Sequence, residues 1–268
     1  MKNVLLLVHD DSGQEARLQG ALDAVRALEG HLACVHVTEL LPLFGDAYGM
    51  SGAVMVQDAA LEAETRNRIE IERRLAREDV PWDWVELMGG IEAALAQASG
   101  LADLIVVNGE LPRRVQPQVR TVVERLVVQT DKPLLVVGDE PKGFRPAEPV
   151  LVAWDGSEPA SAAVRSAVPL LKLSSAVTVY EVDDGSVEKP AEEVASYLSR
   201  HGIGVEVDRD EVPNGDYVEP LLLSKLESGD FGWAVIGAFS RSRFREALFG
   251  GTTKRLLKES PVPLVIAH

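Results

Sequence analysis

The chain carries two copies of one pattern, in which short apolar runs alternate with helix-like segments. Residues 5–12 are an apolar run followed by His-Asp-Asp-Ser, and residues 150–157 are an apolar run followed by Asp-Gly-Ser. The same offset of 145 positions places residues 32–37 on residues 177–182. An internal repeat of this kind constrains the fold strongly, because each copy must form the same unit of structure.

The second copy shows the alternation most clearly. We predict helices at 158–172, 189–201, 216–228 and 252–259, and strands at 150–154, 177–182, 204–212, 233–237 and 263–267. Continuous apolar strands that alternate with helices indicate a parallel sheet covered on both faces, joined by right-handed crossovers. The predicted fold class is therefore α/β, with two doubly wound parallel-sheet domains in tandem.

The boundary between the copies is predicted from composition. Residues 139–149 contain three prolines, a glycine and several charges, which is typical of an inter-domain linker. We therefore expect a first domain at 1–138 and a second at 150–268, called the first half and the second half below. The final strands, Leu134–Val137 and Leu264–Ala267, are candidates to meet across a pseudo-twofold axis, as in a dimer fused into one chain.

Charge and composition limit the partners. The formal net charge of −15 disfavours nucleic acid and anionic lipid, so we expect neither. No apolar stretch is long enough to span a membrane, and the amino terminus lacks the features of a signal peptide. The single cysteine, Cys34, excludes an internal disulfide and is interpreted as an inert core thiol. These features together predict a cytoplasmic protein.

A glycine-rich segment follows the fourth strand of the second half. That strand ends at Gly237, and Gly250 and Gly251 then stand directly before a predicted helix that opens with Thr252 and Thr253. Backbone amides at the positive end of a helix bind anions, and threonine hydroxyls donate hydrogen bonds or cap the helix. The pattern predicts a phosphate-bearing ligand held by the backbone, although the glycines would also suit a tight loop alone.

This segment resembles the end of the universal stress protein family, whose fold is of the adenine-nucleotide alpha hydrolase type. Nucleotide-binding members carry Gly, two residues, Gly, nine residues, Gly and then Ser or Thr. Gly237 and Gly250 fit the first and third glycines, while Ser240 replaces the second and Gly251 replaces the hydroxyl residue. The resemblance covers both halves and implies an adenine nucleotide, ATP with a divalent cation such as Mg²⁺, in the second half.

The resemblance also implies which residues hold the ligand. Asp155 would contact the adenosine, and the backbone at Val182 would read the adenine edge. Trp154 would stack on the base or pack in the core. The residues expected to bind nucleotide are Ala153, Trp154, Asp155, Val182, Gly237, Ser240, Gly250, Gly251, Thr252 and Thr253. A cap or turn role is the alternative for Asp155, and the default for Arg241, Arg243 and Arg245 is a solvated loop.

The first half lacks the pair of glycines that precedes the helix in the second half. Aligned through the last strand, Arg120 and Thr121 occupy the positions of Gly250 and Gly251, so we expect no nucleotide there. Asp10 is taken as the counterpart of Asp155, and His9 is expected to be solvated or capping.

Two further segments of the first half are interpreted more generally. Thr38 to Ala60 would form a flap or an arm, and the charged helix from Glu62 to Glu78 would present a solvated face.

Three functions remain open from the sequence. The first is an ATP-binding regulatory protein of the stress response, and the second is a nucleotide-independent scaffold of the same fold. The third, a slow ATPase, ranks last because no general base or arginine finger is evident, so enzymatic activity is not expected. Pairing of whole chains into a homodimer is left open.

Overall fold

The computed structural model describes residues 1–38, 50–109, 122–185, 187–212, 218–238 and 251–268. The first half forms β1 (Asn3–Val8), α1 (Gln14–Leu28), β2 (His31–Thr38), α2 (Met50–Leu75), β3 (Trp82–Met88), α3 (Ile91–Ala98), the 3-10 helix η1 (Ser99–Leu101), β4 (Leu104–Asn108), α4 (Val122–Thr130) and β5 (Leu134–Val137). The second half forms β6 (Val150–Trp154), α5 (Glu158–Leu171), β7 (Val177–Asp183), α6 (Ala191–Arg200), β8 (Glu206–Glu211), α7 (Val218–Glu227), β9 (Trp233–Gly237), α8 (Gly251–Glu259) and β10 (Leu264–Ala267).

All strands of the described residues join one sheet. Its order is β3-β2-β1-β4-β5-β10-β9-β6-β7-β8, so each half repeats the order of the other outward from the centre. Neighbouring strands are parallel within each half. The large, mostly parallel sheet and the alternation of strands and helices confirm the α/β fold class.

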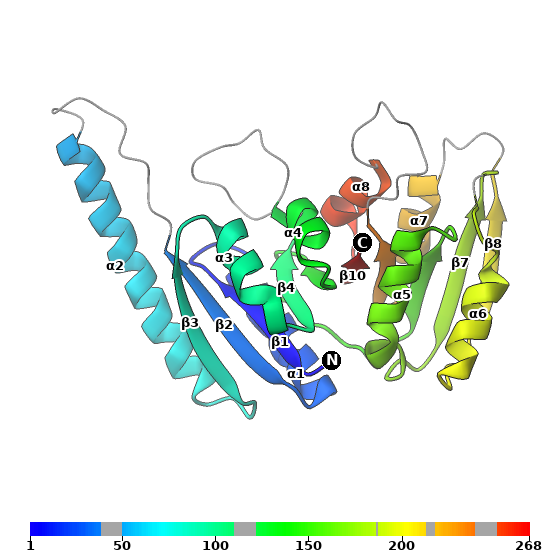
Figure 1. Ribbon diagram of the computed structural model, residues 1–268, viewed down its shortest axis with the longest axis horizontal. Coiled ribbons are helices and arrows are strands. Elements are labelled where there is room, and N and C mark those ends of the chain that lie inside the picture. Colours follow the sequence, from blue (N-terminus) through cyan, green and yellow to red (C-terminus); the bar gives the residue numbers. More distant parts are fainter. Residues whose placement is uncertain (39–49, 110–121, 186, 213–217, 239–250) are drawn as a thin grey trace.

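The two final strands meet at the centre of the sheet. β10 pairs with β5 in antiparallel register, with Val265 opposite Leu135 and Ile266 opposite Leu134. The predicted contact between these strands is therefore confirmed, and Figure 1 shows the two halves side by side about this junction. The assignment of separate domains at 1–138 and 150–268 stays a prediction.

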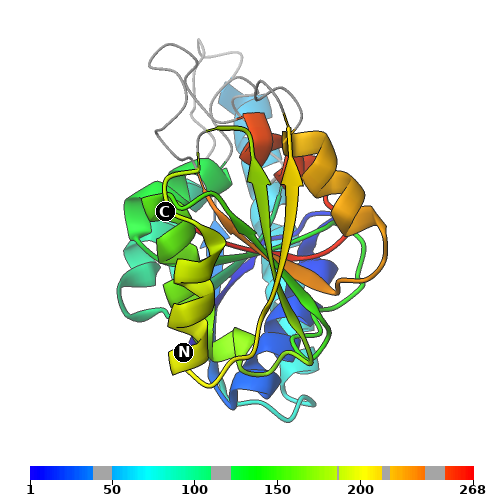
Figure 2. The same ribbon diagram turned by 90° about the vertical axis from the view of Figure 1, so that its right-hand side faces the viewer.

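Helices cover both faces of the sheet. Apolar residues of α1, α2, α5 and α6 pack into the core on one face. Residues of α3, α4, α7 and α8 form the core on the other face, and Figure 2 shows helices on either side of the twisted strands. Each core contains residues from both halves, because the sheet runs without a break through β5 and β10.

The segment 139–149 is docked onto the core. Phe144 is buried, and its ring packs edge-on against Trp233 with centroids 5.6 Å apart. The backbone N–H of Phe144 donates to Asp23 Oδ2 at 2.9 Å. The segment therefore ties α1 of the first half to β9 of the second.

The charged segment of the first half differs from its prediction. Residues 39–49 lie outside the described residues, but Met50 already begins α2, so much of the predicted flap is helical. Glu64 and Asn67, within the segment predicted to be solvated, are buried. Among the described residues, no helix is both long and apolar enough to cross a membrane.

Candidate functional site

Predicted site residues of the second half meet at one edge of the sheet. Trp154 ends β6, Val182 lies near the end of β7, and Gly237 ends β9. These three strands are neighbours, and they are parallel, so their carboxyl ends lie at the same edge. The strand order reverses between β6 and β9, which is where open α/β sheets bind their ligands.

A tight turn fixes Asp155 at this edge. The backbone N–H of Ser157 donates to Asp155 Oδ1 at 3.0 Å, and the Asp155 carbonyl accepts from the Glu188 N–H at 2.9 Å. Gly156 has a φ of 76°, a conformation that favours glycine. Ser157, not Asp155, caps α5, because its side chain accepts from the Ala160 N–H at 3.3 Å. Asp155 therefore takes part in a turn, which was the alternative predicted for it, and this turn holds its carboxylate at the end of β6.

Gly237 permits a close approach between β9 and α5. A Cβ atom at this position would come closer than 3.0 Å to the backbone of Pro159 and Ala160. The end of β9 therefore rests directly on the first turn of α5, beside the Asp155 turn. A glycine at this strand end has a packing reason in the structure as well as its place in the motif.

Trp154 and Val182 have buried side chains. Trp154 lies in the core, and its indole N–H donates to the Lys189 carbonyl at 2.9 Å. Val182 packs into the opposite core, as expected for its side chain, and Ala153 is partly buried against the same core. Of the two predicted roles for the Trp154 side chain, stacking on a base or packing in the core, its position agrees with packing in the core.

The phosphate end of the predicted site is described only in part. Gly251 begins α8, Thr252 follows it, and Thr253 is buried within the helix. Ser240 and Gly250 lie outside the described residues, as do Arg241, Arg243 and Arg245. Among the residues that the structure covers, no group of three His, Cys, Asp or Glu side chains is arranged to hold a metal ion.

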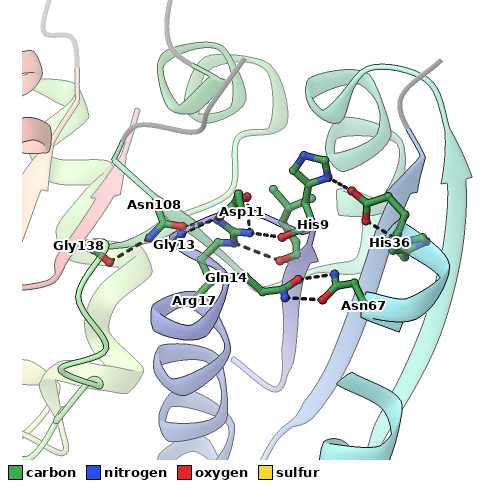
Figure 3. Close-up of polar contacts among 11 residues, drawn as sticks. His9, Asp11, Gly13, Gln14, Arg17, His36, Asn67, Asn108 and Gly138 are labelled. Atoms are coloured by element: carbon green, nitrogen blue, oxygen red, sulfur yellow. Dashed lines mark hydrogen bonds and ion pairs between the residues drawn. The ribbon is translucent and has the colours of Figure 1, made fainter. Parts of the chain in front are cut away.

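The corresponding edge of the first half is filled by a buried arginine. The Arg17 side chain, from α1, is 0% exposed and ion-pairs with Asp11 at 2.8 Å. Its guanidinium also donates to the carbonyls of Leu7 and His9 at 3.2 Å and to Asn108 Oδ1. Figure 3 shows these groups converging at the strand ends. Arg17 thus neutralises the Asp11 carboxylate and donates hydrogen bonds to backbone carbonyls at the end of β1.

A second polar cluster holds α2 against the same edge. Glu64 on α2 places its two carboxylate oxygens 2.9 Å from His9 Nδ1 and 3.2 Å from His36 Nε2, and all three side chains are buried. Burial raises the pKa of Glu64, but the contacts with His36 and His9 outweigh it and lower the pKa to about 2. The carboxylate is therefore ionised at any ordinary pH.

The two halves differ at matched strand ends. Asn108 pairs with Val137 as Gly237 pairs with Ala267, so the asparagine occupies the position of the glycine. A Cβ atom at Gly13 would stand 2.6 Å from the Asn108 side chain. In the first half, therefore, the large residue is on the strand and the glycine stands just before α1, whereas in the second half the glycine is on the strand and approaches Pro159 and Ala160 of α5.

Two expectations for the first half are corrected by the structure. The hydrogen bond equivalent to that of Asp155 is made by Asp11, whose Oδ1 accepts from the Gly13 N–H at 2.9 Å, while Asp10 is exposed. His9 is buried rather than solvated. Two extra residues between β1 and the turn shift the alignment of the two halves, so that Asp11 rather than Asp10 matches Asp155. No local sequence pattern marks Arg17 or Glu64 as buried. Arg120 and Thr121 lie outside the described residues.

A cavity of about 250 Å³ lies elsewhere, at the opposite end of β10 from the predicted site. It is bordered by residues 138–140, by Lys142 and Gly143, and by the Ser260–Pro263 turn. Gly237 pairs instead with Ala267, the last residue of β10. The cavity is therefore separate from the site that the sequence predicts.

Comparison with known proteins supports one family. No family model matches the chain. A universal stress protein of Synechocystis sp. is 26% identical over 182 residues, which cover 64% of this chain and 60% of that protein. The chain thus matches less than two thirds of the length of this curated relative.

Solved structures match the whole chain. A universal stress protein from Archaeoglobus fulgidus DSM 4304 has a TM-score of 0.71 at 15% identity, over 99% of this chain and 97% of that one. One from Pseudomonas aeruginosa UCBPP-PA14, called putative, has a TM-score of 0.57 at 14% identity, over 100% and 93%. The protein is therefore an α/β protein with the fold of the universal stress proteins. The curated relative supports membership of that family.

Proposed function

We propose that the chain is an ATP-binding regulatory protein of the universal stress type, with the nucleotide held in the second half alone. The observation that carries the proposal is the difference between the two matched edges. In the first half, Asn108 and Arg17 fill the strand ends with a satisfied polar network. In the second half, Gly237 ends the strand beside the fixed Asp155 turn.

The arrangement of the second half suits an adenine nucleotide. The Asp155 carboxylate and the Val182 backbone would hold the adenosine. The amino end of α8 would attract the phosphates, because its free N–H groups and dipole favour negative charge. A bound divalent cation would offset the remaining phosphate charge. The residues proposed to surround the phosphates are Gly237, Ser240, Gly250, Gly251, Thr252 and Thr253.

A scaffold without nucleotide is the second candidate. Ser240 and Gly251 replace two of the four motif positions, which favours this alternative. Calorimetric titration with ATP and Mg²⁺ separates the two candidates, because the proposal requires one site per chain. No heat of binding supports the scaffold, and two equivalent sites would show that the filled edge of the first half also accepts nucleotide.

A pair of matched variants locates the site. Gly251→Asp places a carboxylate at the start of α8, where it would oppose the phosphates and abolish ATP binding. Thr121→Asp places the same charge at the aligned position of the first half and should leave the affinity unchanged. Wild-type affinity in a folded Gly251→Asp protein would rule out the proposed phosphate site, and loss of binding in Thr121→Asp would move the ligand to the other half.

A further inference from the structure

The two edges of the sheet are protected to different degrees. β8 carries charges at five of its six positions, and Asp208 and Arg209 form ion pairs with Lys225 and Glu181 at 2.5 and 2.8 Å. Charged edge strands resist the addition of another strand. The matched edge, β3, has only two charges in seven residues, Asp83 and Glu86. β3 is therefore much the less protected edge.

Both acidic side chains of β3 are already paired. Asp83 Oδ2 lies 3.0 Å from His31 Nε2, and Glu86 pairs with Arg68 of α2. The Arg68 guanidinium also lies 5.6 Å from the centre of the Trp84 ring. The edge thus presents less uncompensated negative charge than the acidic composition of the protein would suggest.

Exposed apolar side chains gather at this edge. Of the seven large hydrophobic residues that are exposed among the described residues, four belong to the outermost elements of the first half. Val85 and Met88 lie on β3, and Met88 is 71% exposed. Leu61 and Ile69 lie on α2. Because Trp84 and Glu86 contact Arg68, the even-numbered side chains of β3 face α2 and Val85 projects to the opposite face. The exposed apolar residues therefore border the open edge on both faces of the sheet.

The helical repeat places the α2 residues toward the same edge. Leu61 lies seven residues, or almost two turns, before Arg68 and so projects from nearly the same side of the helix. Arg68 reaches Trp84 and Glu86 on β3, which fixes that side as the one facing the edge strand. Ile69 follows Arg68 on the outer flank. Figure 1 shows α2 beside β3 at the end of the molecule.

Within the part of the chain that the structure describes, the backbone of β3 also has hydrogen-bonding groups available. Pro81 accepts from the Leu32 N–H at 2.9 Å, and the Gly89 N–H donates to Thr38 at 3.0 Å, so odd-numbered residues bond to β2. Alternate residues of a strand direct their backbone groups to opposite sides. The backbone groups that face the open edge are therefore those of the even-numbered residues Trp82, Trp84, Glu86 and Met88.

We propose that β3 pairs with β3 of a second molecule of this chain, antiparallel about a twofold axis at Val85. Trp82 then faces Met88 of the second molecule, and each Val85 faces its equivalent. Trp84 faces Glu86 of the second molecule, so no like charges oppose one another. This register satisfies the free backbone groups, because even-numbered residues meet even-numbered residues. The two α2 helices then lie antiparallel on the face of the joined sheet that carries Trp84, where Leu61 and Ile69 are available to cover the seam, and Val85 lies on the other face.

Salt should strengthen this association. Two molecules of net charge −15 repel each other, and the repulsion is screened over a Debye length of about 10 Å at 0.1 M salt. Sedimentation velocity of the full chain should show a concentration-dependent dimer that becomes more populated as salt rises from low to moderate levels. A monomer at all concentrations up to several hundred micromolar would overturn the proposal.

Opposite charges at Val85 test the contact. Val85→Lys and Val85→Asp each place like charges across the twofold axis, so each variant alone should be monomeric. An equimolar mixture should form a heterodimer. Leu101→Lys, at an exposed apolar position away from this edge, is the matched control and should dimerise like the wild type. Dimers in both single Val85 variants, or no recovery in the mixture, would contradict the proposed seam.

Cysteine substitution tests the register. Directly opposed residues of a non-hydrogen-bonded antiparallel pair have Cα atoms about 4.5 Å apart, within reach of a disulfide. Oxidised Val85→Cys should therefore give a covalent dimer. Asp83→Cys should not, because the two substituted residues would stand roughly 13 Å apart along the strands. Burial raises the pKa of Cys34 to about 12, so the native thiol does not compete. A covalent dimer of Asp83→Cys alone would overturn the register.

Discussion

At the scale of single residues, the first half is distinguished by buried charges that are held in ion pairs. Glu64 belongs to the charged segment that was predicted to present a solvated face, whereas no sequence pattern singled out Arg17. Their burial depends on Asp11, His9 and His36, which the chain brings together only on folding. Side-chain contacts of this kind have no local signature, so the sequence alone does not predict them.

Removal of the Arg17 guanidinium should be strongly destabilising. Arg17→Leu leaves the Asp11 carboxylate without its buried counter-ion and two carbonyls without donors. Breaking a buried pair in this way lowers the free energy of unfolding by about 3–5 kcal/mol. Arg66→Leu removes a guanidinium that is 71% exposed and should change stability by less than about 1 kcal/mol. Urea denaturation measures both, and equal effects would show that the Arg17 network contributes little.

The Glu64 cluster should make the first half sensitive to acid. The pKa of Glu64 is lowered from 4.5 to about 2, so its ionised form stabilises the fold at every pH above about 4.5. This stability is lost as the pH falls from about 4.5 toward 2. Glu64→Gln should remove the contribution, so the difference in stability between wild type and variant should shrink over that interval. Thermal denaturation at a series of pH values measures the stability of both proteins. A difference between them that stays constant as the pH falls would contradict a lowered pKa of Glu64.

At the scale of secondary-structure elements, the sequence predicted the second half closely. Strands expected at 150–154 and 233–237 are observed with those bounds, and the helix expected at 158–172 runs from Glu158 to Leu171. Apolar runs bounded by glycine, proline and charge determine these elements locally. The start of α2 at Met50 was not predicted, because residues 50–60 lack a clear amphipathic period.

The contact between β9 and α5 should be intolerant of a side chain. Gly237→Ala would force a Cβ atom against the backbone of Pro159 and Ala160, and such overpacking costs about 1–3 kcal/mol of stability. It would also displace the Asp155 turn, so ATP affinity should fall. Gly204→Ala meets open space and should change neither property. Wild-type stability and affinity in Gly237→Ala would show that this approach is neither tight nor part of the site.

At the scale of the whole molecule, the repeat and the meeting of the last strands followed from sequence, but the continuity of the structure did not. The junction of β5 and β10 makes one sheet of the two halves, and the cores on both faces include residues of each. Phe144 adds a further link through Trp233. Such continuity depends on packing between segments that are distant in the chain, which pattern alone does not reveal.

The continuous sheet predicts that both halves unfold together, so a ligand of one half should protect the other. ATP at a hundred times its dissociation constant stabilises the folded state by about 2.7 kcal/mol. If β1 and β9 exchange their amide protons only through global unfolding, ATP should slow exchange in both strands by the same factor, about a hundredfold. Hydrogen exchange measured by mass spectrometry on peptides from each strand tests this, with Gly251→Asp as the variant in which neither strand should respond. Protection confined to β9 would mean that the halves open independently and that the β5–β10 junction does not couple them. Equal protection of both strands would mean that a nucleotide bound in the second half stabilises the buried charge network of the first.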